Sequence, residues 1–428
     1  MKIAKATIVD PAQNQAFGLG AVTLSLFVFA YSTRFGPISI LLYYGLWLPL
    51  VLVDYRRVLG PYTRYGWIFA FAAVCFLSSF WSAAPATSLR ASIQYLTHIV
   101  CALVAVRVLA PQTLSRGAMM GCALVLVYSL LVGSYHYDPI DGRYSFVGAF
   151  SSKNQLGLYA SLGVLFAFTT CFVFRARGVW LVLSACAGII SAYSLMASQS
   201  ATSVITTAVI ILLAVGLQVM VRVPPRQRRH LLVACVLVAI AGATSALQSG
   251  AMDAVLGAFG KDTTLTGRTY LWQQGIESAA ASPGFGVGYQ GYWVPGFPEA
   301  ERLWDDFFIA SRSGFHFHNT FIETMVETGV VGTLFLAFVL LRTAAGHSRR
   351  LLVLNRSPDA VLFCAVTTLL IIRSFVEIDV MHPYHVGSFL LYFAAGRLTL
   401  ARQQPNSATA SSRARPRREL PQIRVGLG

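Results

Sequence analysis

The sequence predicts an all-α integral membrane protein with about twelve transmembrane helices and one large loop outside the membrane. Of its 428 residues, 56% are apolar and only 12% are charged, and the mean hydropathy is +0.62. A soluble domain carries about 25% charged residues. The apolar residues lie in long blocks such as Phe17–Tyr31 and Leu114–Val132, and about 20 apolar residues in a row are typical of a membrane-spanning helix. These observations exclude a soluble enzyme and a disordered chain.

The apolar blocks divide the chain into nine spans (residues 1–247), a large loop (248–317) and three further spans (318–400). A basic tail of residues 401–428 follows, and its Ser, Arg and Pro content predicts disorder. Twelve spans place both termini on one side of the membrane. The predicted helices are 17–33, 37–53, 66–82, 90–109, 114–133, 155–174, 179–197, 202–221, 230–247, 318–341, 359–376 and 384–400.

Positive charge orients these spans. With the N-terminus in the cytoplasm, 24 of the 33 Lys and Arg residues lie on the cytoplasmic side and nine lie outside, as the bias of Lys and Arg toward cytoplasmic loops requires. Asp and Glu show the opposite bias, with four of 17 inside. Both termini are therefore expected to be cytoplasmic. Topology and contact with anionic lipids explain the net charge of +16, and no nucleic-acid partner is expected.

The large loop is the first place to look for chemistry. Long loops in compact folds are usually functional or disordered. This loop contains Trp272, Trp293, Trp304 and many Phe and Tyr residues, which argues against disorder. We expect it to fold as small helices on the outer face of the membrane.

A histidine opens the tenth span. The sequence reads His318-Asn319, nine further residues, and then Gly329-Val330-Val331-Gly332. On a continuous helix, positions 318, 322, 325, 329 and 332 share one stripe, and two glycines on it would let a neighbouring helix approach closely. His318 would then face the bundle interior and could take a proton from an acceptor hydroxyl. The alternative is a core histidine or a helix-start residue.

Other titratable residues surround this histidine. His316 could form a metal site with His318, but no carboxylate or cysteine in the sequence completes it, so no metal is expected. Glu323 and Glu327 lie four residues apart. They could orient a base, but an ion pair within the bundle is the favoured interpretation.

The loop contains an arginine motif and a glycine-rich motif. Gly267-Arg268 begins a predicted helix that includes Trp272, and Pro283-Gly284-Phe285-Gly286-Val287-Gly288 follows it as a turn. The turn does not follow a strand, so it is a weak dinucleotide signal. Arg268 could hold phosphate oxygens with its forked guanidinium group, or it could be a surface arginine.

Two more cations lie near the outer ends of spans. Lys153, followed by Asn154, enters the sixth span on the side where lysine is disfavoured, and a cation there needs a partner such as an anionic ligand. A lysine that extends its side chain to the boundary is the alternative. Arg373 closes the eleventh span and could bind a ligand or pair with Glu377 four residues later.

These motifs, in this order, resemble the O-antigen ligase and polymerase superfamily of bacterial membrane glycosyltransferases. The resemblance covers most of the chain and rests on the His-Asn and Gly-x-x-Gly pattern at 318–332, the Gly-Arg-x-x-x-Trp piece at 267–272 and the glycine-rich turn at 283–288. The Ser-Lys-Asn-x-Leu-Gly stretch at 152–157 is more similar to the exopolysaccharide-polymerase branch.

The resemblance implies a GT-C-like fold and an inverting, metal-independent glycosyltransferase without cofactor in the bacterial inner (plasma) membrane. Its donor would be a glycan on undecaprenyl diphosphate at the periplasmic face. His318 would be the catalytic base and Arg268 a diphosphate ligand, with Lys153 and Arg373 as further candidate ligands. Candidate supporting residues are Asn319, Glu323, Glu327, His316 and Asn154.

One departure from the family pattern concerns the turn between the seventh and eighth spans. Many members carry an arginine or lysine there, but residues 197–203 of this chain contain none. Either Lys153 or Arg373 replaces that cation, or the donor is bound more weakly, or the chain is inactive or uses a different donor.

The acceptor and the class of activity stay open at this point. A polymerase would transfer to another glycan repeat, and a ligase would transfer to a lipid A–core acceptor. A transporter or flippase would show paired repeats and charges at mid-membrane, and neither is evident in the sequence. A non-catalytic scaffold that binds other polysaccharide assembly proteins is the remaining alternative.

Overall fold

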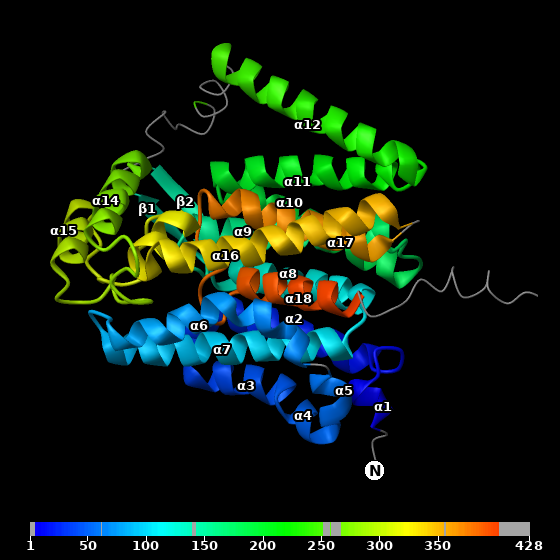
Figure 1. Cartoon of the computed structure of the whole chain (residues 1–428). Coiled ribbons are helices and arrows are strands. Elements are labelled where there is room, and N and C mark those ends of the chain that lie inside the picture. The colour runs from blue at the N-terminus through cyan, green and yellow to red at the C-terminus, as the bar shows by residue number, and fades with distance from the viewer. Residues whose placement is uncertain are drawn as a thin grey trace, which may run out of the picture.

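The computed structural model describes residues 5–60, 62–138, 143–250, 257, 267–354 and 357–401. Long helices lie side by side and form a thick bundle (Figure 1). Helices α14 (Arg268–Ala281) and α15 (Pro298–Asp306) lie at one end, which we call the loop end. Helices α1 (Ala6–Val9) and α5 (Tyr55–Leu59) lie at the opposite end. The basic tail predicted at 401–428 is outside the described residues apart from Ala401.

Each of the twelve predicted ranges contains a helix or a broken helix. Proline begins seven of the described helices. Its fixed φ suits the first turn, and the N–H that it lacks would have no partner there. The further elements are α2 (Gln15–Phe35), α3 (Pro37–Trp47), α4 (Pro49–Val53), η1 (Tyr62–Phe69), α6 (Ala70–Leu77), η2 (Ser78–Phe80), α7 (Pro85–Val108), α8 (Pro111–Val132), α9 (Lys153–Phe168), η3 (Thr169–Val173), α10 (Val179–Ala197), α11 (Ala201–Met220), α12 (Pro225–Gln248), α16 (Thr320–Val353), α17 (Pro358–Ser374) and α18 (Val386–Ala401).

Many of the helices have the length and composition of membrane spans. Within the described ranges, eight helical segments are long and apolar enough to cross a membrane. Four predicted spans are not among these eight. The span 37–53 is divided into α3 and α4 at Pro49, α17 and α18 have 17 and 16 residues, and α12 covers the span predicted at 230–247. The structure is mostly helical and contains candidate membrane spans, as predicted. The number of twelve crossings and the place of the large loop outside the membrane stay predictions.

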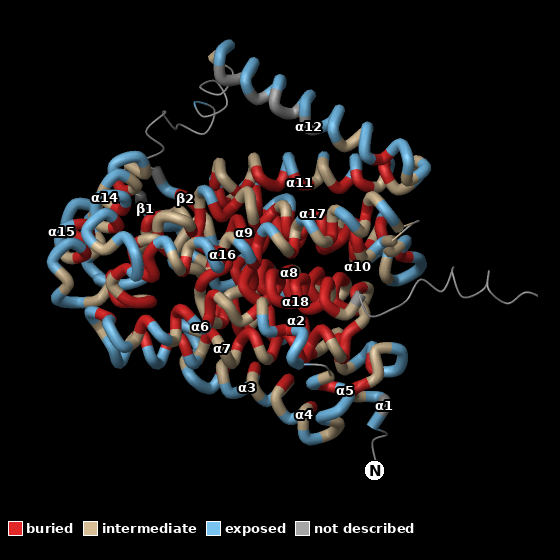
Figure 2. Tube along the Cα trace, in the orientation of Figure 1, coloured by how far each residue is buried: buried red, intermediate tan, exposed pale blue. Residues whose placement is uncertain are grey.

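The core lies along the middle of the bundle. Helices α8 and α18 are buried over most of their length, whereas α12 is largely exposed at one edge (Figure 2). A Cβ at Gly117 or Gly121 of α8 would lie 2.7 Å from the Cβ of Val22 or 2.9 Å from that of Leu26 on α2. Small residues on α8 therefore let these two helices approach closely, as is common in membrane bundles.

The connection at 134–154 and the large loop at 248–317 differ in how closely they match the prediction. The connection at 134–154, expected only as a loop, contains an antiparallel hairpin of β1 (Ser134–Asp138) and β2 (Arg143–Gly148). The large loop contains the expected helices α14 and α15, and its buried residues, such as Leu271, Trp304 and Phe317, form a second small core with Val326 of α16. The part of this loop at 251–256 and 258–266 lies outside the described residues.

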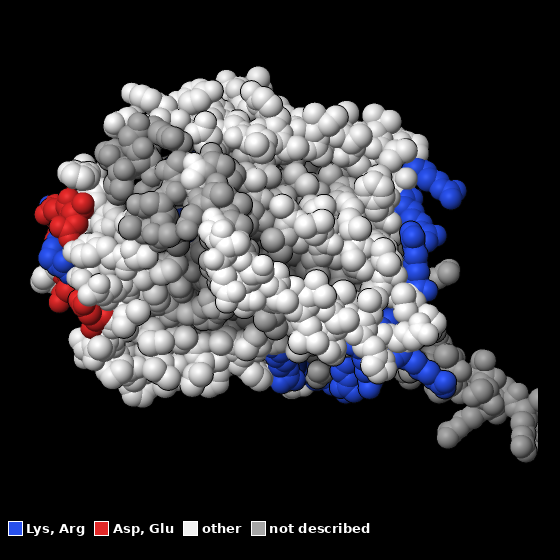
Figure 3. All heavy atoms as spheres, turned by 90° about the horizontal axis from the view of Figure 1, so that it is seen from above, with Lys and Arg blue, Asp and Glu red and all other residues white. Residues whose placement is uncertain are grey.

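Charged residues separate between the two ends. On the face shown in Figure 3, Asp and Glu side chains gather at the loop end, beside a few cations, and Lys and Arg gather at the opposite end. Helix α15 supplies acidic residues to the loop end, including Glu299 and Glu301 in its first turn. The separation matches the charge asymmetry counted along the sequence.

Helix α16 is broken at Gly329, which corrects the predicted continuous stripe. Gly329 has φ 64° and ψ −171°, a backbone conformation that is essentially restricted to glycine. The amides of Val330 and Val331 leave the helix and donate to Pro283 and Gly284 at 2.8 and 3.3 Å. In a continuous helix these amides would donate to the carbonyls of Val326 and Glu327. Those carbonyls instead accept from the amides of Val287 and Gly288 at 3.0 and 2.8 Å. The partner that approaches Gly329 is therefore the glycine-rich turn, and not a helix.

Candidate active site

Three segments far apart in the sequence meet at the loop end of the bundle. They are the start of α14, residues 316–319 before α16, and residues 375–379 after α17. Each lies at or just beyond a helix end, where the chain can leave regular structure. The bundle thus brings the arginine motif, the histidine motif and the end of the eleventh predicted span to one place.

Glu377 joins the two residues that the sequence singled out most strongly. Its Oε1 accepts from Nη2 of Arg268 at 2.8 Å, and its Oε2 lies 3.3 Å from Nδ1 of His318. Arg268 also donates from Nη1 to the carbonyl of Val376 at 2.9 Å. The Glu377 side chain is 6% exposed, against 14% for Arg268 and 23% for His318. The carboxylate is therefore buried behind a histidine that solvent can reach.

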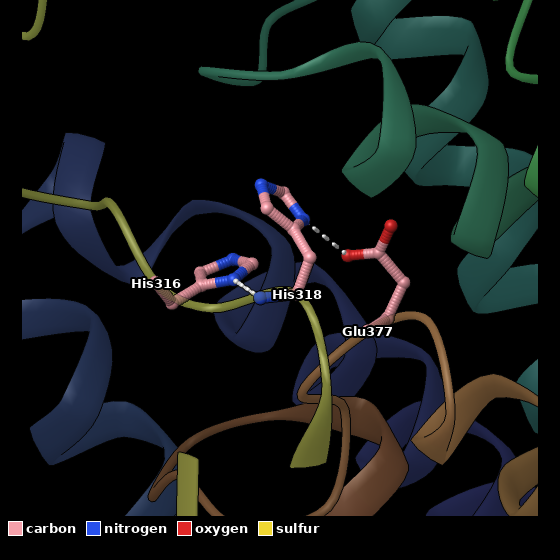
Figure 4. A group of neighbouring side chains, drawn as sticks. All are labelled: His316, His318 and Glu377. Carbon is pink, nitrogen blue, oxygen red and sulfur yellow. Dashed lines mark hydrogen bonds and ion pairs between the residues drawn. The ribbon is translucent and has the colours of Figure 1, made fainter. Parts of the chain in front are cut away.

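The contact with Glu377 determines which nitrogen of His318 can act. An ionised carboxylate only accepts hydrogen bonds, so Nδ1 of a neutral His318 carries the hydrogen. Nε2 then has the free lone pair, as in other sites where a carboxylate orients an imidazole. Figure 4 shows the His318 ring with one nitrogen turned to Glu377 and the other turned away from it. The arrangement can accept a proton at Nε2.

The backbone of His318 is held in an unusual conformation by its neighbours. His318 has φ 52°, in the left-handed region that few non-glycine residues adopt. On one side, Glu323 accepts from the Phe317 amide and from the Trp293 indole, both at 2.7 Å. On the other side, Asn319 caps α16 by accepting from the amides of Phe321 and Ile322 and donates to the Phe375 carbonyl. These anchors fix the direction in which the imidazole leaves the chain.

The electrostatics favour a neutral imidazole at His318 beside an ionised Glu377. Burial lowers the pKa of His318, and the Arg268 guanidinium lowers it further, whereas Glu377 opposes both. Burial alone would raise the pKa of Glu377, but Arg268 and His318 hold that pKa well below its usual range. The imidazole is thus unprotonated and the carboxylate charged at neutral pH.

His316 completes a group that could hold a metal ion. Ligand atoms of His316, His318 and Glu377 lie within 4.8 Å of one another, so Glu377 is the carboxylate that the sequence did not reveal. However, Nδ1 of His316 accepts from the His318 amide at 3.1 Å, and Glu377 already binds a guanidinium. Burial keeps the pKa of His316 well below its usual value. The fixed positive charge of Arg268 disfavours a divalent cation at this position.

Arg373 belongs to a second polar cluster beside the first. It pairs with Asp379 through Nε and Oδ2, and not with Glu377 as the four-residue spacing had suggested. Its Nη1 lies 3.4 Å from Oγ of Ser203, which lies in the first turn of α11 and ends the stretch 197–203. Ser203 in turn contacts Ser200, whose hydroxyl donates to Asn154 at 2.9 Å. The stretch 197–203, which contains no Lys or Arg, thus contacts the guanidinium group of Arg373.

The predicted residues therefore divide between two clusters. Arg268, His318 and His316 surround Glu377, whereas Asn154 and Arg373 belong to the Asp379 cluster, and the segment 373–379 connects the two. Lys153 begins α9, next to Asn154. Two carboxylates, Glu377 and Asp379, are central and were not predicted as site residues.

Among the described residues, the structure does not contain the ion pair that was expected for Glu323 or Glu327. Neither forms an ion pair within the described ranges: Glu323 holds Phe317 and Trp293, and Oε2 of Glu327 is buried without a hydrogen-bond partner there. The carboxylate of Glu323 instead holds the backbone next to His318, through the Phe317 amide.

Comparison with known proteins shows the family to which the chain belongs. A family model described as O-antigen ligase matches residues 162–337. The chain is also 57% identical over 404 residues to the exopolysaccharide production protein ExoQ of Rhizobium meliloti (strain 1021), covering 94% of this chain and 93% of that protein. The chain belongs to the O-antigen ligase family. Arg268 and His318 lie within the part that matches the O-antigen ligase model, which confirms the resemblance seen in the sequence and implies a membrane protein of glycosyltransferase type.

Proposed function

We propose that this protein is an inverting membrane glycosyltransferase that polymerises an undecaprenyl-diphosphate-linked glycan during exopolysaccharide synthesis. The observation that carries the proposal is Glu377, which holds a permanent cation and an imidazole on its two oxygens. A glycosyl transfer from a diphosphate needs these two functions close together: a group that takes a proton and a group that stabilises a leaving anion.

The proposed reaction uses His318 as the base. Nε2 of His318 takes the proton of an acceptor sugar hydroxyl. The hydroxyl oxygen attacks the anomeric carbon of the donor while the bond from that carbon to the diphosphate oxygen breaks, and the configuration inverts. General-base catalysis typically contributes about 10²–10⁴-fold.

Arg268 is the proposed ligand of the leaving diphosphate. Its planar group matches phosphate oxygens better than an ammonium does, and it lies at the start of a helix, where anions are favoured. Lys153 is the proposed second ligand. Arg373, 1% exposed and neutralised by Asp379, instead supports the site by fixing the segment that carries Glu377.

We place this site on the periplasmic side. The loop end carries the acidic residues of α15, whereas Lys and Arg gather at the opposite end (Figure 3). Cytoplasmic ends are typically the basic ones, so the loop end is assigned to the periplasm and both termini to the cytoplasm. The protein would then meet its donor after the lipid-linked glycan has reached the outer leaflet.

A ligase is the second candidate, because the matching family model is described as O-antigen ligase. The printed name of ExoQ, exopolysaccharide production protein, favours polymerisation. The products separate the two: a polymerase yields long chains on the lipid donor, and a ligase yields chains attached to lipid A–core.

The test is turnover of a defined undecaprenyl-diphosphate oligosaccharide by the purified protein, with and without a chelator. We expect longer lipid-linked chains of inverted linkage and the same rate in both conditions. No product with any lipid-linked donor would contradict the proposed activity. A rate abolished by the chelator and restored by a metal would contradict the metal-independent mechanism alone.

A further inference from the structure

A cavity lies at the end of the bundle opposite Glu377. It has a volume of about 260 Å³ and is lined by Arg64, Trp67, Arg342 and Thr399, which come from η1, α16 and α18. Arg342 lies 22 residues after the start of α16, which is about 33 Å along a helix. That length is close to the thickness of the hydrocarbon core of a bilayer, so the cavity lies at the far boundary of the membrane.

The cations of this cavity have no carboxylate partner among the described residues. Other arginines at the same end do have one: Arg57 pairs with Asp10 at 2.9 Å and Arg397 with Asp359 at 3.2 Å. Arg342 lies over the Trp67 ring, with its guanidinium carbon 4.5 Å from the ring centre, and its Nε is buried without a hydrogen-bond partner. Arg64 is exposed at the cavity rim.

Two guanidinium groups around one small cavity attract an anion, and a phosphate suits them best. Forked N–H groups match phosphate oxygens. Tryptophan is enriched at the level of lipid headgroups, and basic pockets between transmembrane helices on the cytoplasmic side bind anionic headgroups. We infer that this cavity binds the phosphate of an anionic lipid.

The surface beside the cavity favours a lipid over free phosphate. Phe338 and Leu341, on the same stretch of α16 as Arg342, are 42% and 59% exposed. A lipid whose phosphate occupies the cavity would find apolar helix surface for its acyl chains in the direction of the membrane core. This site is independent of the proposed transfer reaction.

The experiment measures the thermal stability of the full chain in detergent during titration with phosphatidylglycerol, phosphatidylcholine or inorganic phosphate. The site variant is Arg64→Gln with Arg342→Gln. The control, Arg226→Gln with Arg349→Gln, removes the same charge from exposed positions. We expect phosphatidylglycerol to stabilise the wild type and the control, and its apparent affinity to fall about tenfold or more in the site variant.

The outcomes are distinct. Equal responses of the site and control variants to phosphatidylglycerol would overturn the site. Stabilisation by inorganic phosphate alone, lost in the site variant, would support the phosphate site and overturn the lipid assignment. If the double variant does not fold, Arg64→Gln alone, at an exposed side chain, should weaken phosphatidylglycerol binding about threefold or more, and an unchanged affinity would count against the site.

Discussion

At the residue scale, the proposed chemistry depends on one carboxylate whose two oxygens contact different side chains. Glu377 gives one oxygen to Arg268 and the other to His318. It thereby fixes the tautomer of the base and brings the cation next to it. A donor diphosphate would compete with Glu377 for Arg268, so that binding of the donor and the state of the base would be linked.

The first prediction concerns Glu377→Gln, which keeps the shape and removes the charge. We expect kcat/KM to fall about 10²-fold or more, because the wrong tautomer of the base is no longer excluded. The base must be unprotonated, and the pKa of His318 is lowered by burial and Arg268, so the wild-type rate should fall in acid with a midpoint below about 6.5. Glu377 raises that pKa, and its loss should move the midpoint to still lower pH.

The measurement is a pH profile of kcat/KM between about pH 4.5 and 8. Glu299→Gln, at an exposed position of α15, is the matched control and should retain the wild-type profile. A midpoint that stays in place or moves to higher pH in Glu377→Gln would count against the assigned contact.

The second prediction concerns Arg268→Lys. We expect KM for the lipid-linked donor to rise and kcat to fall, by about tenfold or more in kcat/KM, because an ammonium cannot form the paired hydrogen bonds of a guanidinium. Steady-state kinetics with varied donor checks this. Arg302→Lys, in the same loop and about half exposed, should leave the kinetics unchanged. Equal kinetics in both variants would remove Arg268 from donor binding.

The sequence could predict His318 and Arg268, because each stands in a short polar motif beside long apolar spans. It could not predict Glu377. The spacing of Arg373 and Glu377 suggested a pair on one helix, but α17 ends at Ser374. Beyond that point the chain turns, so Arg373 meets Asp379 and Glu377 faces α14. Beyond a helix end, the conformation of the turn determines which side chains meet. The spacing of residues along the sequence does not define that conformation.

At the element scale, the break in α16 connects the histidine motif to the glycine-rich turn. Four hydrogen bonds replace the two that the helix loses at Gly329, so the two freed amides and the two freed carbonyls each have a partner. The turn follows α14, whose first residue is Arg268. The break thus helps to set the position of the arginine relative to the base.

The third prediction concerns Gly329→Ala. Its backbone conformation is strained for any residue with a Cβ, and the added methyl group would overlap the backbone at Gly284. We expect a loss of at least about 2 kcal/mol in the free energy of unfolding, seen as a lower unfolding midpoint in detergent. Gly284→Ala is the control, since a Cβ there meets nothing within 4 Å. Equal midpoints for both variants would contradict the break.

Helix positions were predictable from the sequence, but this break was not. Apolar blocks of suitable length define where helices occur, and proline defines many of their starts. The sequence predicted that Gly329 and Gly332 let a neighbouring helix approach closely. Gly329 differs because the glycine-rich turn at 283–288, more than 40 residues upstream, forms hydrogen bonds with the helix backbone on either side of it. This is a long-range contact that no local pattern encodes.

At the scale of the whole molecule, the two ends of the bundle differ in charge and in the site that each contains. The loop end contains the proposed active site, and the opposite end contains the basic cavity. The sequence could predict this polarity because charge follows topology. The clusters themselves depend on which helix ends become neighbours, and a single sequence does not define that.

The fourth prediction tests the orientation of the bundle. Ser311→Cys lies in the large loop and Gln227→Cys near the start of α12, and both positions are exposed. A maleimide that does not cross membranes should label Ser311→Cys in spheroplasts above the background of the native cysteines, and Gln227→Cys only after permeabilisation. Labelling in the reverse order would put the proposed site on the cytoplasmic side.

The most direct test of the central claim is the transfer rate of His318→Ala on a defined undecaprenyl-diphosphate oligosaccharide. We predict a fall of about 10²-fold or more with an unchanged unfolding midpoint. His136→Ala, at an exposed histidine of β1, should keep the wild-type rate. A folded His318→Ala protein that extends the glycan as fast as the His136→Ala control would contradict the assignment of the base, and with it the active site built around Glu377.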